Sequence, residues 1–91
     1  MADICVSFRV SGRVQGVWFR GWTQKEAMAR GLSGWVRNHS DGSIAGVVAG
    51  PPEEVNEFIA ALHGGPPAAR VDAVDWSEAK PIEDAGFRIL R

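Results

Sequence analysis

The sequence has no tyrosine, two methionines, two histidines and a single cysteine, Cys5. One cysteine cannot form an internal disulfide, which fits a reducing compartment such as the cytoplasm. No run of eighteen or more apolar residues is present, so no membrane span is expected. The first ten residues also lack the basic and apolar regions of a secretory signal. The histidines, the cysteine and the scattered acids show no metal-ligand spacing, and we expect neither metal nor cofactor.

The chain also carries little net charge, because ten Lys and Arg residues stand against eleven Asp and Glu residues. A domain with a pI near 6.1 lacks the basic footprint of a nucleic-acid-binding protein. The charge is uneven, with six cations and three acids in residues 1–50 and four cations and eight acids in residues 51–91. Small chains often show such asymmetry by chance, but it favours the first half as the place where an anion would bind.

What is present is a clear alternation of strand and helix patterns. Apolar and polar residues alternate over residues 4–11, which predicts a half-buried strand. Good helix formers fill residues 21–30, and a second helix begins in the Gly-Pro-Pro-Glu-Glu segment at residues 50–54. That helix has an apolar stripe at i, i+3, i+4 and i+7 spacing: Val55, Phe58, Ile59 and Leu62. Further strands are expected at residues 32–38, 43–49, 69–76, where the apolar spacing indicates a bulge, and 87–91.

This order, β-α-β-β-α-β with a short terminal strand, predicts a fold class. Right-handed βαβ crossovers leave a gap beside the first strand, which the third strand can fill. We therefore expect an α+β, ferredoxin-like split β-α-β sandwich with both helices on one face of an antiparallel sheet. Ninety-one residues make one domain. The architecture alone does not specify a function.

The segment GRVQGVWFRG at residues 12–21 lies between the first strand and the first helix. Backbone N–H groups in such a turn have no intrahelical partners, and a curl at Gly16 would direct several of them at one anion. Arg20 could grip two oxygens of that anion, and phosphate offers more oxygens than a carboxylate. The same spacing also fits an ordinary turn with a solvated arginine. Three apolar residues would anchor the segment in the core: Val14, Val17 and Phe19.

Other phosphate-binding motifs are excluded by position. A P-loop that began at Gly12 would need glycine where Val17 stands, and the dinucleotide pattern GxGxxG does not occur. A thiol phosphatase cradle would need cysteine where Val14 stands, with five residues between it and Arg20. Cys5 is therefore not a nucleophile beneath a phosphate, and we expect it to be a small strand residue.

Two motifs carry a resemblance to a known family. GRVQGVWFR at residues 12–20 resembles the acylphosphatase signature G-x-V-Q-G-V-x-F-R. A second signature of that family, with Ile44 in place of the usual valine, is matched by Gly34, Trp35, Val36, Arg37, Asn38, Gly42 and Gly50. Both motifs occur in the family's order and at its separation. We therefore expect a single acylphosphatase-like domain over residues 1–91.

The resemblance implies hydrolysis of the carboxyl–phosphate anhydride of small acyl phosphates, giving a carboxylate and inorganic phosphate without metal or cofactor. Phosphate would be both product and competitive inhibitor. Arg20 would clamp the phosphoryl oxygens, and Asn38 would orient the attacking water. The phosphate cradle would consist of the backbone amides of Gln15, Gly16, Val17, Trp18, Phe19 and Arg20. We expect a cytoplasmic monomer that acts on a small molecule and binds neither nucleic acid nor membrane.

The sequence allows two roles for each of several side chains near the motifs. Trp18, at a variable position of the signature, either walls the mouth of the cradle and touches the acyl group or caps the core. His39 is either a solvated turn residue or a general base, and Asn38 taken alone would be turn chemistry. The remaining charged side chains in question are expected to be solvated: Arg13, Arg37, Glu53, Glu54, Glu57 and His63.

Two other functions compete with the enzyme. Acylphosphatase-like domains also occur within larger proteins that handle carbamoyl phosphate, so a non-hydrolysing module that binds acyl phosphate, carbamoyl phosphate or phosphate is the alternative. An RNA-binding sheet of similar topology would need aromatic side chains exposed on its central strands. Phe8 lies on the apolar face of its strand instead, which argues against RNA.

Overall fold

The computed structural model describes residues 2–83 and 85–90. They form five strands and two helices, with loops between them. In chain order they are β1 (Ile4–Arg13), α1 (Phe19–Ala29), β2 (Ser33–Asn38), β3 (Ile44–Gly50), α2 (Pro52–Gly64), β4 (Arg70–Glu78) and β5 (Phe87–Ile89). The expected α+β ferredoxin-like fold is confirmed. None of the helices in the described residues has the length and apolar character needed to cross a bilayer.

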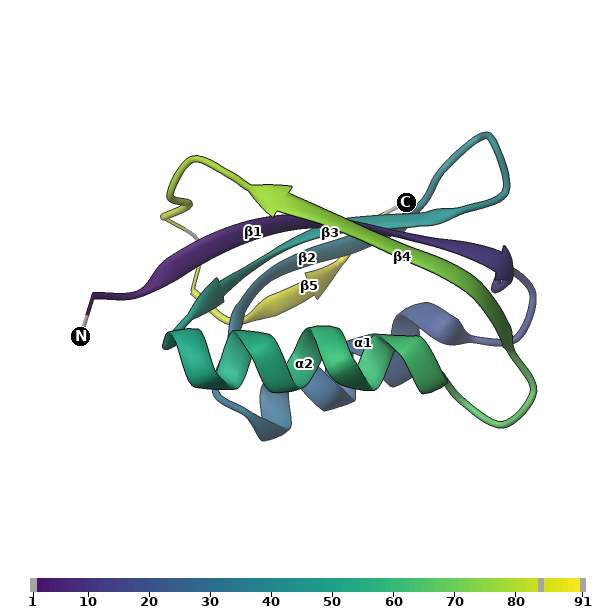
Figure 1. Ribbon diagram of the computed structural model, residues 1–91, viewed down its shortest axis with the longest axis horizontal. Helices are drawn as coiled ribbons and strands as arrows, with labels where there is room; N and C mark the ends of the chain where they lie inside the picture. Colours follow the sequence, from purple (N-terminus) through teal and green to yellow (C-terminus); the bar gives the residue numbers. More distant parts are fainter. Residues whose placement is uncertain (1, 84, 91) are drawn as a thin grey trace.

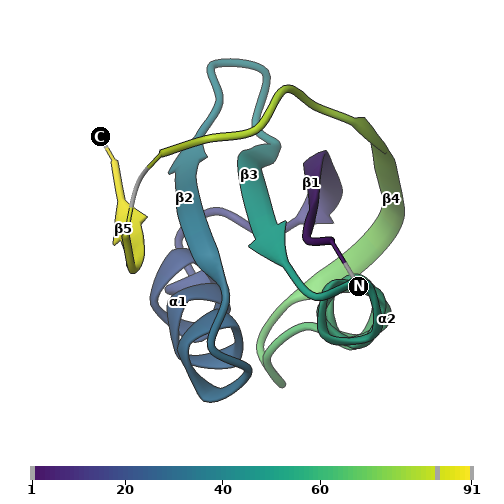
Figure 2. The same cartoon turned by 90° about the vertical axis from the view of Figure 1, so that its left-hand side faces the viewer.

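The sheet has the order β4-β1-β3-β2-β5, with β4 and β5 at its two edges (Figures 1 and 2). β1 pairs antiparallel with β3 and β4, and β2 pairs antiparallel with β3. One detail differs from the expectation, because β5 runs parallel to β2 and the sheet is therefore mixed. The connection after β4 crosses from one edge of the sheet to the other, and this delivers the short β5 to the free edge of β2 (Figure 2).

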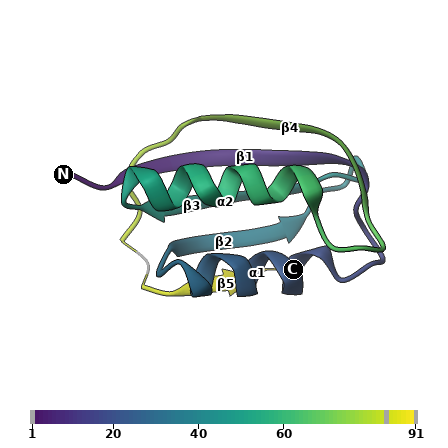
Figure 3. The same cartoon turned by 60° about the horizontal axis from the view of Figure 1, so that its bottom comes forward.

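Both helices cover the same face of the sheet (Figure 3). The alternation in β1 decides which face that is, because Val6, Phe8 and Val10 are buried there. Phe8 meets Phe58 of α2 edge to face, with ring centroids 5.4 Å apart. The predicted stripe of α2 is confirmed as its buried face: Val55, Phe58, Ile59 and Leu62.

A β-bulge lies where β1 leaves the sheet. Ser11 is opposite Ala73 but Gly12 is opposite Val71, so Asp72 is the extra residue on β4. The predicted bulge is thus confirmed. Gly12 has φ 127°, and a Cβ there would overlap the carbonyl oxygen of Arg70, so only glycine fits. The bulge brings β1 to its end at the loop that precedes α1.

Candidate active site

The loop between β1 and α1 has an unusual backbone. Gly16 (φ 81°) and Trp18 (φ 55°, ψ 37°) are both left-handed, whereas Gln15, Val17 and Phe19 have negative φ. Left-handed residues that alternate with others turn successive N–H groups toward one side, which makes an anion-binding concavity. Such groups also have no acceptor in the helix that follows. The first backbone hydrogen bond of α1 joins the Trp22 N–H to the Trp18 carbonyl at 3.2 Å.

Apolar residues fix this loop to the core, as expected. Val14 and Phe19 are each 1% exposed, and Val17 packs against the core while partly buried. The Phe19 ring meets Trp22 edge to face at 5.3 Å. α1 begins at Phe19, directly after the left-handed Trp18 and two residues earlier than its helix formers indicate. The loop therefore starts from a rigid base.

A hollow of about 300 Å³ opens beside the loop. Its lining brings together the two residues that the motifs single out, Arg20 from the first turn of α1 and Asn38 from the end of β2. The Arg20 guanidinium donates from Nη1 to the Leu90 carbonyl at 3.4 Å, and its Cζ lies 5.4 Å from the centroid of the Trp18 ring. The complete lining is Val14, Gly16, Trp18, Phe19, Arg20 and Asn38.

Asn38 presents its side chain where β2 ends. Its backbone is held in the sheet opposite Ile44, and the residue is exposed. Within residues 2–83 and 85–90 the Asn38 carboxamide has no hydrogen-bond partner. An amide has both donors and an acceptor, so this group is available to hold a water or a substrate oxygen in the hollow.

The turn that follows Asn38 is closed by Asp41. Oδ1 of Asp41 accepts from the Ser43 hydroxyl at 2.6 Å and from the Ser43 N–H at 2.9 Å. These bonds, with the hydroxyl first, lower the pKa of Asp41 from 3.8 to about 2. The folded-state pKa is depressed, so this stabilisation of the turn is complete above pH 4 and is lost as the pH falls toward 2. The turn is therefore held throughout the neutral range.

His39 belongs to the same turn and not to the hollow. Its Nδ1 accepts from the Asp41 N–H at 3.4 Å, and His39 is not among the residues that line the hollow. This is turn chemistry, and the geometry gives no support to His39 as a general base. The carbonyl oxygen of His39 accepts a hydrogen bond from the Gln15 side chain.

Trp18 does not cap the core, and that interpretation is wrong. The side chain is 63% exposed, and its ring lies against Gly21 and beside Arg20. A left-handed backbone is a rare conformation for so bulky a residue. It places the indole at the wall of the hollow while the Trp18 N–H stays in the loop.

Other side chains with reactive chemistry lie elsewhere. Cys5 is buried in β1 at 8% exposure, and His63 is exposed in the last turn of α2. Within the part of the chain that the structure describes, no group of three or more His, Cys, Asp or Glu side chains could hold a metal ion. The hollow next to Arg20 is therefore the place where a basic side chain, a free amide and unpaired backbone donors coincide.

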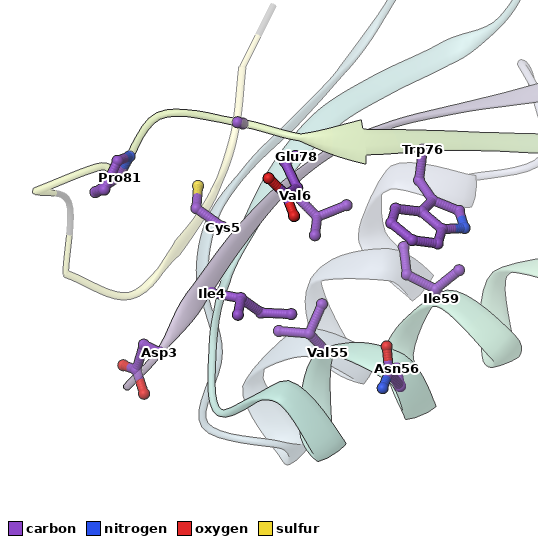
Figure 4. A pocket seen from close by; sticks show the side chains of 11 residues that line it. Asp3, Ile4, Cys5, Val6, Val55, Asn56, Ile59, Trp76, Glu78 and Pro81 are labelled. Carbon is purple, nitrogen blue, oxygen red and sulfur yellow. The ribbon is translucent and has the colours of Figure 1, made fainter. Parts of the chain in front are cut away.

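A larger cavity of about 450 Å³ lies between α2, the start of β1 and the end of β4 (Figure 4). Its walls are mainly apolar, and the 58% exposed Trp76 faces Ile59 across it. The charged side chains among its described lining are those of Asp3 and Glu78, which would repel a phosphate. This cavity does not suit the anion that the loop favours.

Comparison with known proteins decides the family. The family model described as acylphosphatase matches residues 6–89. The chain is 52% identical to the acylphosphatase of Azoarcus sp. strain BH72 over 82 residues, which cover 90% of this chain and 84% of that protein. The chain belongs to the acylphosphatase family.

Solved acylphosphatase structures share the fold as well. The acylphosphatase from Coxiella burnetii superimposes with a TM-score of 0.93 at 36% identity, covering 97% of this chain and 93% of that one. Full-length HypF, in its phosphate- and nucleotide-bound form, matches with a TM-score of 0.91 at 26% identity, covering 99% of this chain but 12% of its own. The family domain therefore also occurs as a small part of a larger protein.

The predicted family and activity are thereby confirmed. The activity is that of an acylphosphatase, EC 3.6.1.7, and the substrate is an acyl phosphate. The roles of Arg20, Asn38 and the loop amides remain predictions.

Two contacts at the site have no signal in the sequence. The Gln15 side chain donates to the β2–β3 turn, and Arg20 donates to a backbone carbonyl near the other end of the chain. All three acceptors are main-chain oxygens, which every residue type has. Motif spacing therefore could not reveal them.

Proposed function

We propose that this acylphosphatase binds the phosphoryl group of its substrate in the hollow beside the β1–α1 loop. The observation that supports this most strongly is that Arg20 and Asn38, from two separate motifs, line one hollow next to the left-handed loop. Arg20 would grip two phosphoryl oxygens, and the Asn38 amide would hold the attacking water. The remaining donors would be the N–H groups of Gln15, Gly16, Val17, Trp18, Phe19 and Arg20.

The reaction needs little beyond this set of groups. The oxygen of the water attacks phosphorus, the bond from phosphorus to the acyl oxygen breaks, and its electron pair leaves on the carboxylate. The water proton passes to a phosphoryl oxygen of the substrate, because an amide such as Asn38 has no useful basicity near neutral pH. The protein's contribution is to stabilise charge on the phosphoryl oxygens and to place the water in line.

The proposal includes independence from metal and cofactor. A carboxylate is a good leaving group, and the guanidinium with the loop amides supplies the positive charge that phosphoryl transfer requires. Inorganic phosphate fits the same donors and would inhibit competitively. A monomer in the reducing cytoplasm is consistent with the single, buried Cys5.

Hydrolysis of acetyl phosphate in the presence of EDTA tests this function directly. We expect full turnover at EDTA concentrations that remove divalent cations, and competitive inhibition by inorganic phosphate. Loss of activity in EDTA, restored by a divalent cation, would contradict the proposed chemistry. Thermal stabilisation by acetyl phosphate without turnover would indicate the non-hydrolysing module instead.

We assign the acyl group to the side of the hollow that Trp18 forms. The exposed indole offers an apolar wall beside Arg20, so an aromatic acyl group would contact it more than an acetyl group would. The phosphoryl end would still bind to the loop amides. Preference for the acyl group would then depend on one side chain.

Gly21→Ala is a way to displace the indole without deleting it. A Cβ at position 21 would overlap the Nε1 atom of Trp18, and the exposed ring is free to move away. Alanine favours a helix over glycine by about 0.5–1 kcal/mol, so we expect Tm to be unchanged or higher. KM for benzoyl phosphate should rise several-fold while KM for acetyl phosphate stays nearly constant. An equal rise for both substrates would mean that Trp18 does not select the acyl group.

A further inference from the structure

The side chain of Gln15 joins the β1–α1 loop to the β2–β3 turn. Its Nε2 donates to the His39 carbonyl at 2.8 Å and to the Ser43 carbonyl at 3.0 Å, in a part-buried position. The two acceptors lie at the two ends of the turn. Figure 1 shows that the β1–α1 loop and the β2–β3 turn lie at the same end of the molecule.

These contacts engage both N–H groups of the Gln15 amide and both lone pairs of each acceptor carbonyl. The His39 carbonyl also accepts from the Gly42 N–H at 3.1 Å, and the Ser43 carbonyl accepts from the His39 N–H at 2.8 Å. Each carbonyl thus has both of its lone pairs engaged, and the Gln15 amide uses both of its N–H groups. A side chain of the same length without donors could not make these two bonds.

The turn has few other ties to the rest of the protein at this point. β1 pairs with β3 as far as Ile44, so the turn extends beyond the sheet. Besides Gln15, the described link from the turn is the ion pair of Asp41 with Arg9 of β1 at 3.5 Å, where both side chains are about half exposed. Exposed ion pairs of this kind contribute little. The part-buried amide of Gln15 is the stronger of the two links.

The Gln15 hydrogen bonds lie between the two parts of the proposed active site. Gln15 is the first residue of the proposed phosphate cradle, and His39 directly follows Asn38 in the chain. One side chain therefore connects the group that would bind the phosphoryl oxygens with the group that would hold the water.

We propose that Gln15 is a positioning residue that sets the distance and direction of the Asn38 amide relative to the phosphate cradle. This rests on the roles proposed above for Asn38 and the loop. Without the link, Arg20 and the loop amides still bind phosphate, but the water is no longer held in line. A misplacement of about 1 Å can cost on the order of 10²-fold in rate.

Gln15→Met tests this, because methionine has a similar length and no donor. We expect kcat for acetyl phosphate to fall by about 10- to 100-fold, with KM and the inhibition constant of inorganic phosphate changed less than about twofold. Gln24→Met is the matched control, since Gln24 Nε2 donates to the Phe87 carbonyl at 2.9 Å between α1 and β5 and makes no described contact with the β2–β3 turn. Both variants should lose some thermal stability, Gln15→Met more because it loses two hydrogen bonds and Gln24→Met one, but the large loss of kcat should occur in Gln15→Met alone.

A double variant separates positioning from general structural damage. If Gln15 acts through Asn38, then Gln15→Met lowers kcat little further once Asn38→Ala is present. Independent, multiplicative losses in the double variant would overturn the inference, as would a rise in the phosphate inhibition constant that matches the loss of kcat. The proposed function fails by a different result, namely an unchanged kcat in Asn38→Ala alone.

Discussion

Arg20→Ala is expected to lower kcat/KM for acetyl phosphate by at least 10²–10³-fold, the typical cost of removing one preorganised donor at a developing charge. Inhibition by inorganic phosphate should weaken strongly in the same variant, because product and transition state share the phosphoryl oxygens that the guanidinium would grip. The reason is local. In the described structure Arg20 is the basic side chain that lines the hollow. The measurement is steady-state hydrolysis with phosphate as a competing ligand.

Two further variants show whether geometry or charge is responsible. Arg20→Lys retains the charge but not the two-pronged guanidinium, so it should recover only a small part of the activity. Lys25→Ala removes an exposed cation from the same helix and should leave kcat/KM within about twofold, since distant surface charges act only through screened fields. If Arg20→Ala lowered kcat/KM but left phosphate inhibition unchanged, the phosphoryl oxygens would not be bound by Arg20.

Asn38→Ala is expected to reduce kcat by on the order of 10²-fold while phosphate inhibition stays nearly intact. The carboxamide lies at the hollow without a hydrogen-bond partner among residues 2–83 and 85–90, so its removal should cost little stability. What it removes is the group that would orient the water. Measurement of kcat beside the phosphate inhibition constant tests this division of roles between Asn38 and Arg20.

His39→Ala is the appropriate comparison for Asn38→Ala. Its imidazole contacts Asp41 in the turn, and its backbone carbonyl, the acceptor for Gln15, is retained in alanine. Activity should therefore remain within a few-fold of the unmodified protein. A loss in His39→Ala as large as that in Asn38→Ala would revive the general-base interpretation. An equal weakening of phosphate binding in Asn38→Ala and Arg20→Ala would contradict the separate roles.

Periodic burial is the part of this fold that sequence patterns predict well. The alternation that ends at Val10 and the stripe that begins at Val55 each mark the side of an element that faces the core. The parallel pairing of β5 was not predictable, because three residues such as Phe87–Ile89 carry no signal for which edge they join. The exposure of Trp76 was also not predictable, because the sequence does not show how much of the sheet α2 covers.

The site shows the same division. The resemblance to the family motifs predicts Arg20 and Asn38 as site residues, both of which line the hollow, and the glycine at position 16 indicates a curled loop. The left-handed Trp18 was not predictable, because bulky residues rarely adopt that conformation and propensity argues against it. The Gln15 contacts depend on how closely two loops approach, which is set by the register of β2 and β3. The sequence therefore predicts which residues form the candidate site, but not the hydrogen bonds between the two loops that hold them in place.

The contact between Arg20 and the Leu90 carbonyl spans 70 residues, and β5 is held to β2 by the Leu90 N–H bond to Val36 at 2.8 Å. During translation the amino-terminal part emerges first, so Arg20 has no carbonyl partner until Leu90 has been synthesised. β1 likewise has no β4 to pair with until residues 70–78 have been synthesised. A nascent chain stalled before residue 90 would carry Arg20, Asn38 and Gln15 on an incomplete sheet, so we expect activity to begin only after β4 and β5 have been synthesised and have joined the sheet.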